Sequence, residues 1–194
     1  MQAQEPDPNQ EVINLLRQAS QVVNQIPEPQ RMMAAVNIAG RLAVAGDFST
    51  ALAMAHSLAR PQDREPAIDT IACSLDSQRR REEALQLLSE VSSEQTAIIC
   101  SKLAKSHADK KDFGVALQLA HRIQDQPAHR VQALLAIAKA QWQADKRDDA
   151  RSTMQEALEA AGQAREKLSE MATVVQLKQG LFCKHKPTYR YRPG

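Results

Sequence analysis

The stretch Asn37-Ile38-Ala39, followed by Gly46-Asp47-Phe48-Ser49-Thr50-Ala51, predicts an apolar helix, a tight break and a second apolar helix. The same pattern occurs three more times. Each copy has an alanine in its first helix and another alanine twelve residues later in its second. These pairs are Ala39 and Ala51, Ala72 and Ala84, Ala104 and Ala116, and Ala138 and Ala150. Successive copies are 33, 32 and 34 residues apart, a period typical of helical-hairpin repeat arrays.

The repeat pattern divides the chain into segments. We expect residues 1–8 to be flexible, 9–26 to form an N-terminal helix and 27–163 to form four helix pairs. The expected helices of these pairs are 30–45 and 49–58, 65–77 and 81–91, 94–108 and 113–123, and 128–144 and 147–161. After Gly162, a separate helix over 164–177 is expected to cap the array, because an array needs a polar outer face at its end. Residues 178–194 lose the helical period and are expected to form an extended basic tail.

The composition predicts an all-α protein. Apolar residues make up 43% of the chain and aromatic residues only 3%, so the core must consist of Ala, Leu, Ile and Val. No alternating run of β-branched residues bounded by turns is found. Three widely spaced cysteines do not indicate a disulfide framework. No apolar run is long enough to span a membrane.

The charge and the N-terminus bear on the partner and on the compartment. The net charge is only +2, and the repeat region gives no electrostatic reason to expect nucleic acid. The chain has no recognisable signal peptide, so we expect a cytoplasmic protein. The alternative is an exported or periplasmic protein, in which Gln2-Ala3-Gln4-Glu5 would follow an initiator methionine placed on a processed mature end.

The alanine spacing and two of the turns carry a resemblance to a known family. Gly46-Asp47-Phe48 and Lys111-Asp112-Phe113 look like the Gly-Asp-Tyr turn of the tetratricopeptide repeat, and the twelve-residue alanine spacing is similar to that of the same family. The similarity covers residues 31–161, although the early Trp and the mid-helix Tyr of the family are absent. A HEAT-like or another tetratricopeptide-like array is the alternative. Both imply a right-handed α-solenoid of about four antiparallel helix pairs, with an N-terminal helix and a C-terminal capping helix.

The resemblance also implies a binding surface. In the tetratricopeptide family, ligands lie on a concave face formed by the first helix of each pair. Trp142 is the only tryptophan of the chain, and a partly exposed tryptophan is a common interface anchor. By matching position, the implied partner-binding residues are Met33, Val36, Asp69, Asp76, Ser101, Lys105, Lys139, Trp142 and Gln143.

The basic tail is a second candidate binding segment. Aromatic residues that alternate with basic residues can stack on bases and pair with phosphates. The tail residues concerned are Phe182, Lys184, Lys186, Tyr189, Arg190, Tyr191 and Arg192.

We find no constellation that indicates catalysis. The sequence has neither a Gly-rich phosphate loop nor a nucleophile elbow. His56 and His121 occupy the same place in copies one and three, which favours a structural role for both. We therefore expect no enzymatic activity, no cofactor and no metal. The leading hypothesis is a protein–protein interaction module that binds a protein or peptide on its concave face. The alternative is a nucleic-acid or anionic-surface binder that uses the tail.

Overall fold

The computed structural model describes residues 8–28 and 30–183, and it describes their side chains except those of Pro8, Asn24 and residues 167–183. All regular secondary structure in this part of the chain is helical, which confirms the predicted all-α class. The elements are α1 (Pro8–Val22), η1 (Val23–Gln25), α2 (Gln30–Ala45), α3 (Phe48–Ser57), α4 (Pro61–Ser77), α5 (Arg81–Gln86), η2 (Leu87–Glu90), α6 (Ser93–Asp109), α7 (Phe113–His121), α8 (Pro127–Gln143) and α9 (Arg147–Cys183). Over the described residues, no helix is both long and apolar enough to cross a bilayer.

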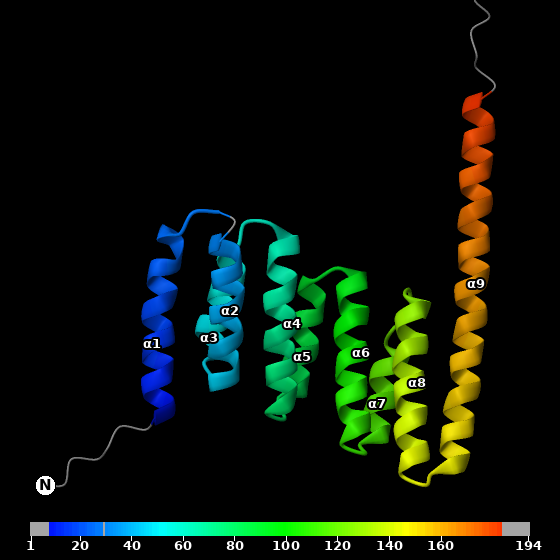
Figure 1. Cartoon of the computed structure of the whole chain (residues 1–194), viewed down its shortest axis with the longest axis horizontal. Helices are drawn as coiled ribbons and strands as arrows, with labels where there is room; N and C mark the ends of the chain where they lie inside the picture. The colour runs from blue at the N-terminus through cyan, green and yellow to red at the C-terminus, as the bar shows by residue number, and fades with distance from the viewer. Residues whose placement is uncertain (1–7, 29, 184–194) are drawn as a thin grey trace, which may run out of the picture.

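The helices follow one another along the long axis of the molecule. The first helix of each pair packs against its own second helix and against the first helix of the next pair, so that α2, α4, α6 and α8 form a continuous row. Figure 1 shows this row in front, with α3, α5 and α7 behind it, α1 at one end and α9 at the other. Helix pairs that are adjacent in the sequence are therefore also adjacent in space.

The alanines of the repeat pattern form the seams between the helices. All eight alanines that define the twelve-residue spacing are buried, with at most 4% of their surface exposed. Since alanine carries only a Cβ atom, helices can approach closely at these positions. The approach is even closer at Gly40, where an added Cβ would lie 2.9 Å from Thr70 Cγ2.

The turn inside each pair has the same backbone geometry in all four copies. If the first-helix alanine of a copy is numbered position 0, the residue at position +7 has a positive φ angle in every copy. These residues are Gly46 (93°), Arg79 (65°), Lys111 (65°) and Asp145 (60°). The next backbone N–H donates to the carbonyl at position +3 over 2.9 Å, as from Asp47 to Leu42 and from Lys146 to Gln141. This is the hydrogen bond that ends a helix in the Schellman motif.

A partly buried ion pair joins α1 to the first pair. Arg17 Nε donates to Asp47 Oδ2 over 2.7 Å, and the backbone N–H of Thr50 donates to Asp47 Oδ1 over 3.3 Å. Asp47 is thus also the N-cap of α3. Burial alone would raise the pKa of Asp47, but the hydrogen bonds from Arg17, Thr50 and Ser49 outweigh it and lower the pKa to about 2.

The starts of α4 and α6 follow from residues in the linkers. Pro61 occupies the first turn of α4, which therefore begins four residues before the predicted start at 65. Ser92 caps α6, because its side chain accepts a hydrogen bond of 3.2 Å from Gln95 N. Pro127 has the same place in α8 as Pro61 in α4.

The C-terminal part differs from the prediction. Instead of a helix ending at 161, a separate capping helix over 164–177 and an extended tail from 178, one helix of 37 residues runs from Arg147 to Cys183. A glycine inside a helix costs only about 1 kcal/mol relative to alanine, and the alanine-rich flanks of Gly162 favour the helix. Figure 1 shows the second half of α9 projecting beyond the row. The flexible N-terminus was expected over 1–8; α1 already begins at Pro8, and residues 1–7 lie outside the described residues, as do the tail residues 184–194.

Candidate functional site

The predicted partner-binding residues do not all lie on the surface. Met33, Lys105, Lys139, Trp142 and Gln143 are exposed, as that prediction requires. Val36 is half-buried and lines a hollow of about 500 Å³ beside α1.

Three of the predicted residues are engaged inside the array. Asp69 on α4 is half-buried and forms an ion pair with Lys102 on α6. Ser101 is buried. Asp76 is also buried, with only 2% of its side chain exposed, and its carboxylate lies against His107 of α6. Asp69 and Asp76 thus bind residues of the next pair, and Ser101 is covered. Their assignment to a partner-binding surface stays a prediction.

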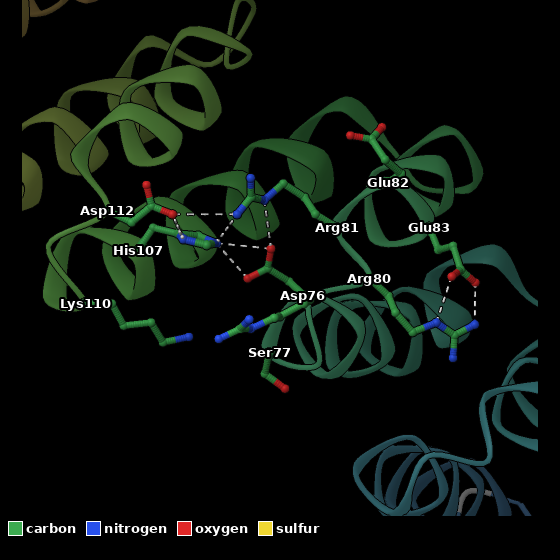
Figure 2. Close-up of a pocket in the computed structure, with 10 residues that line it drawn as sticks. Asp76, Ser77, Arg80, Arg81, Glu82, Glu83, His107, Lys110 and Asp112 are labelled. Carbon is green, nitrogen blue, oxygen red and sulfur yellow. Dashed lines mark hydrogen bonds and ion pairs between the residues drawn. The ribbon is translucent and has the colours of Figure 1, made fainter.

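Asp76 belongs to a charged cluster between the second and third pairs. Its carboxylate lies 2.8 Å (Oδ2) and 3.1 Å (Oδ1) from His107 Nε2, and Arg81 Nε donates to Oδ1 over 3.3 Å. The other ring nitrogen, His107 Nδ1, lies 3.1 Å from Asp112 Oδ2. Figure 2 shows His107 between the two carboxylates, with Arg81 beside them. Two acids, one arginine and one histidine thus meet where α4, α5 and α6 converge.

The geometry of the cluster argues against a catalytic role for His107. Both ring nitrogens lie within hydrogen-bond distance of carboxylates, and Arg81 Nη2 lies 3.5 Å from Nε2. Neither nitrogen therefore faces an open space in which a substrate or a metal could reach it. Two carboxylates that meet a histidine and an arginine suit a buried polar network. The cluster therefore serves to join α4 to α6.

The cluster lies beside a polar hollow of about 940 Å³. Arg80 on its wall forms an ion pair with Glu83 and lies over the ring of Phe48, 4.6 Å from the ring centroid. Lys110 points into the open space in Figure 2. The hollow is lined by Asp76, Ser77, Arg79, Arg80, Arg81, Glu82, Glu83, His107, Lys110 and Asp112.

The sequence prediction missed His107, Arg81 and Asp112. A signal for His107 was present, because position +3 is Leu42 in the first copy and Leu75 in the second. A histidine in place of a buried leucine needs buried partners. Asp76, at position +4 of the preceding copy, meets this need.

The exposed apolar residues of the last pair surround a second hollow. It measures about 450 Å³ and is largely apolar, with Trp142, Leu135 and Met154 on its walls. Trp142 is 56% exposed, and Arg147 lies over its ring at 5.5 Å from the centroid. Three of the predicted residues, Lys139, Trp142 and Gln143, line this hollow together. We call it the Trp142 hollow; its remaining lining residues are Ala138, Ala150 and Arg151.

Two residues of the Trp142 hollow stand at repeat positions that are buried in every other copy. Trp142 stands at position +4, where the other copies have the buried residues Ala43, Asp76 and Ala108. Met154 stands at position +16, where the other copies have the buried residues Ala55, Leu88 and Ala120. In those copies the next helix pair follows directly along the row. The hollow is therefore the face on which a further pair would pack.

The repeated histidines occupy equivalent surface positions. His56 Nε2 lies 2.6 Å from Glu90 Oε2, and His121 Nε2 lies 2.7 Å from Glu156 Oε2. Each links the second helix of one pair to the second-helix segment of the next. This geometry agrees with the structural role that their spacing favoured.

The described cysteines are poorly suited to thiolate chemistry. Burial and the nearby Asp69 carboxylate raise the pKa of Cys73 to about 12. Burial likewise raises the pKa of Cys100. Because the thiolate is the reactive form, both side chains are expected to be inert packing residues.

Comparison of the chain with known family models, with curated proteins and with solved structures finds no match. Among the described side chains, no group of three His, Cys, Asp or Glu residues is arranged to hold a metal ion.

Proposed function

We propose that this chain is a tetratricopeptide-like, right-handed α-solenoid of four helix pairs, and that it acts as a non-enzymatic binding module for a protein or peptide. The regular recurrence of buried alanines and of left-handed turn residues supports the array. The His107 cluster supports the non-enzymatic part, because both ring nitrogens of this buried histidine lie against carboxylates of the chain itself.

The Trp142 hollow carries the proposal. A tryptophan that is 56% exposed at a position buried in the other three copies presents apolar surface that a partner can cover. Tryptophan is also the residue type most enriched among interface residues that dominate affinity. Lys139 and Gln143 supply polar groups at the edge of the same hollow.

The shape of the hollow favours a helical partner segment. It lies between α8 and α9, and two helices leave a groove into which the apolar side of a third helix can pack. Such a partner would present apolar side chains at helical spacing to Trp142, Leu135 and Met154. The proposed ligand is therefore an amphipathic helix.

The experiment is a capture assay in which the full chain is the bait. Trp142→Ser should reduce capture of a bound protein at least tenfold, since removal of a central tryptophan commonly costs about 2 kcal/mol or more. Leu15→Ser is the matched control: Leu15 is also exposed and apolar but lies on α1, outside the hollow. Equal capture by the wild type and Trp142→Ser would refute the proposed site.

A further inference from the structure

We propose that the Trp142 hollow is the docking site for residues 164–182 of a second copy of this chain. The inference rests on the proposed function, because it names the occupant of the same hollow. It follows from three observations: the register of contacts between neighbouring pairs, the sequence that continues after the fourth pair, and the straight course of α9.

The first observation is how the first helices of neighbouring pairs contact each other at two junctions. Position −2 lies against position +1 of the preceding copy at the first junction and against position −3 at the second. Thr70 thus lies against Gly40, and Lys102 pairs with Asp69. Position +3 lies against position +4 of the preceding copy, as His107 does against Asp76. A further first helix on the fourth pair should obey the same register.

The second observation is that the chain carries such a helix in its sequence. Leu134, Ile137 and Ala138 of the fourth copy are matched 34 residues later by Leu168, Met171 and Ala172. Ala172 is therefore position 0 of a fifth first helix, and Glu170 and Val175 stand at positions −2 and +3.

The register brings complementary residue types together on the hollow. Position −2 is to lie against positions +1 and −3 of the fourth copy, so that Glu170 would meet Lys139 beside Leu135. Position +3 is to lie against position +4, so that Val175 would meet Trp142. An opposite charge thus falls on the lysine and an apolar residue falls on the tryptophan. The sequence of residues 164–182 therefore fits the face that the structure leaves open.

The third observation is that residues 164–182 continue α9 and do not form a separate helix over the hollow of their own chain. Each first helix from α4 onward follows a helix-starting residue eleven or twelve positions before position 0, namely Pro61, Ser92 or Pro127. The corresponding residues of the fifth copy are Ala160 and Ala161, which favour helix continuation.

Accordingly, α9 runs through this point without a break and projects from the row in Figure 1. A segment that continues α9 leaves the hollow of its own chain uncovered and can pack on a second copy. Two copies that exchange the same element reciprocally form a closed symmetric dimer.

The test measures the mass of the full chain by size-exclusion chromatography with light scattering over a range of concentrations. The wild type should form a dimer. Trp142→Asp and Val175→Asp should each weaken the dimer at least tenfold, since each puts a charge into both exchanged contacts. Lys105→Glu is the control, because Lys105 is exposed at the same repeat position as Lys139 but lies one copy away from the hollow.

Mixing the two weakened variants separates exchange between chains from folding back within one chain. A mixed dimer of Trp142→Asp and Val175→Asp has one fully wild-type contact and one doubly altered contact. Native mass spectrometry should therefore show the mixed dimer in excess over either variant's own dimer. Folding back within one chain predicts no such rescue, so its absence would overturn the inference.

Trp142 is the only tryptophan, so its fluorescence reports directly on the hollow. In the wild type the emission should move to shorter wavelength as the dimer forms, and in Val175→Asp it should stay unchanged over the same concentrations. A wild-type chain that stays monomeric, or a dimer indifferent to both substitutions, would overturn the inference.

These results are distinguishable from failure of the proposed function. A monomeric chain that still captures a protein through Trp142 refutes only the second-copy occupant. A Trp142-dependent dimer whose capture of other proteins does not depend on Trp142 refutes only the binding of a different protein.

Discussion

Replacement of Asp76 by alanine should destabilise the protein strongly, and a second substitution, His107→Leu, should repair most of the damage. The single variant leaves His107 buried without the carboxylate that now lies 2.8 Å from its ring. The double variant reproduces a combination that the chain already uses. Between the first and second pairs, the same two positions are Ala43 and Leu75, and both residues are buried.

The expected magnitudes follow from burial. Removing one partner of a buried ion pair costs about 3–5 kcal/mol, because the other group remains buried without compensation. We expect about 3 kcal/mol for each single variant, since Arg81 stays beside the cluster with a third of its side chain exposed. Replacing both partners by apolar residues is commonly close to neutral. The double variant should therefore lie within about 1 kcal/mol of the wild type.

The measurement is urea unfolding at pH 7 for the wild type, both single variants and the double variant. Helical circular dichroism and Trp142 fluorescence should report the same transition. A coupling energy of at least about 3 kcal/mol is expected from the double-mutant cycle. If the loss of unfolding free energy in the double variant equals the sum of the losses in the two single variants, Asp76 and His107 do not stabilise the contact between α4 and α6 as a coupled pair.

Three further predictions concern the frame of the array. Arg17→Met should lower stability at pH 7, and urea unfolding of both proteins at several pH values checks this. The pKa of Asp47 is about 2 in the folded protein, and its ordinary value is 3.8. The difference in stability between the wild type and Arg17→Met should therefore be complete above about pH 4 and be lost as the pH falls through 2. Lys111→Gly should raise the melting temperature, since relief of the positive φ contributes about 1 kcal/mol. Gly40→Ala should destabilise by about 1 kcal/mol through its contact with Thr70, and the same change in a Thr70→Ala background should stabilise, as urea unfolding would show.

The helices could be predicted from the sequence because short-range signals decide them. Alanine spacing located both helices of every pair, and it correctly marked the buried seams. The course of the chain after 161 could not be predicted in this way. A helix ends at Gly162 only if packing of the following residues elsewhere stabilises the chain more than continuation of the helix does. Which of these two free energies is larger depends on tertiary contacts. In the structure α9 continues through it.

The candidate site was predicted only in part, and the reason is again tertiary. Position alone placed Lys139, Trp142 and Gln143 on one surface, and they do line one hollow. The same reasoning placed Asp76 on that surface, but a residue at position +4 is open only where no further pair follows. Asp76 is followed by the third pair and is covered, whereas Trp142 is followed by α9 alone and is exposed.

The contacts of the array repeat every two pairs rather than every pair. Arg80 lies over Phe48 between the first two pairs, and Lys146 lies over Phe113 between the last two. The two His–Glu ion pairs join the same two sets of neighbours. The contact between the second and third pairs is of another kind, with the buried Asp76 and His107 at its centre. In this alternation the fourth pair corresponds to the second pair. The outer face of the second pair is covered by α6, so the outer face of the fourth pair corresponds to a face that receives a following helix. This correspondence supports the proposal that a further helix packs on the face that carries Trp142.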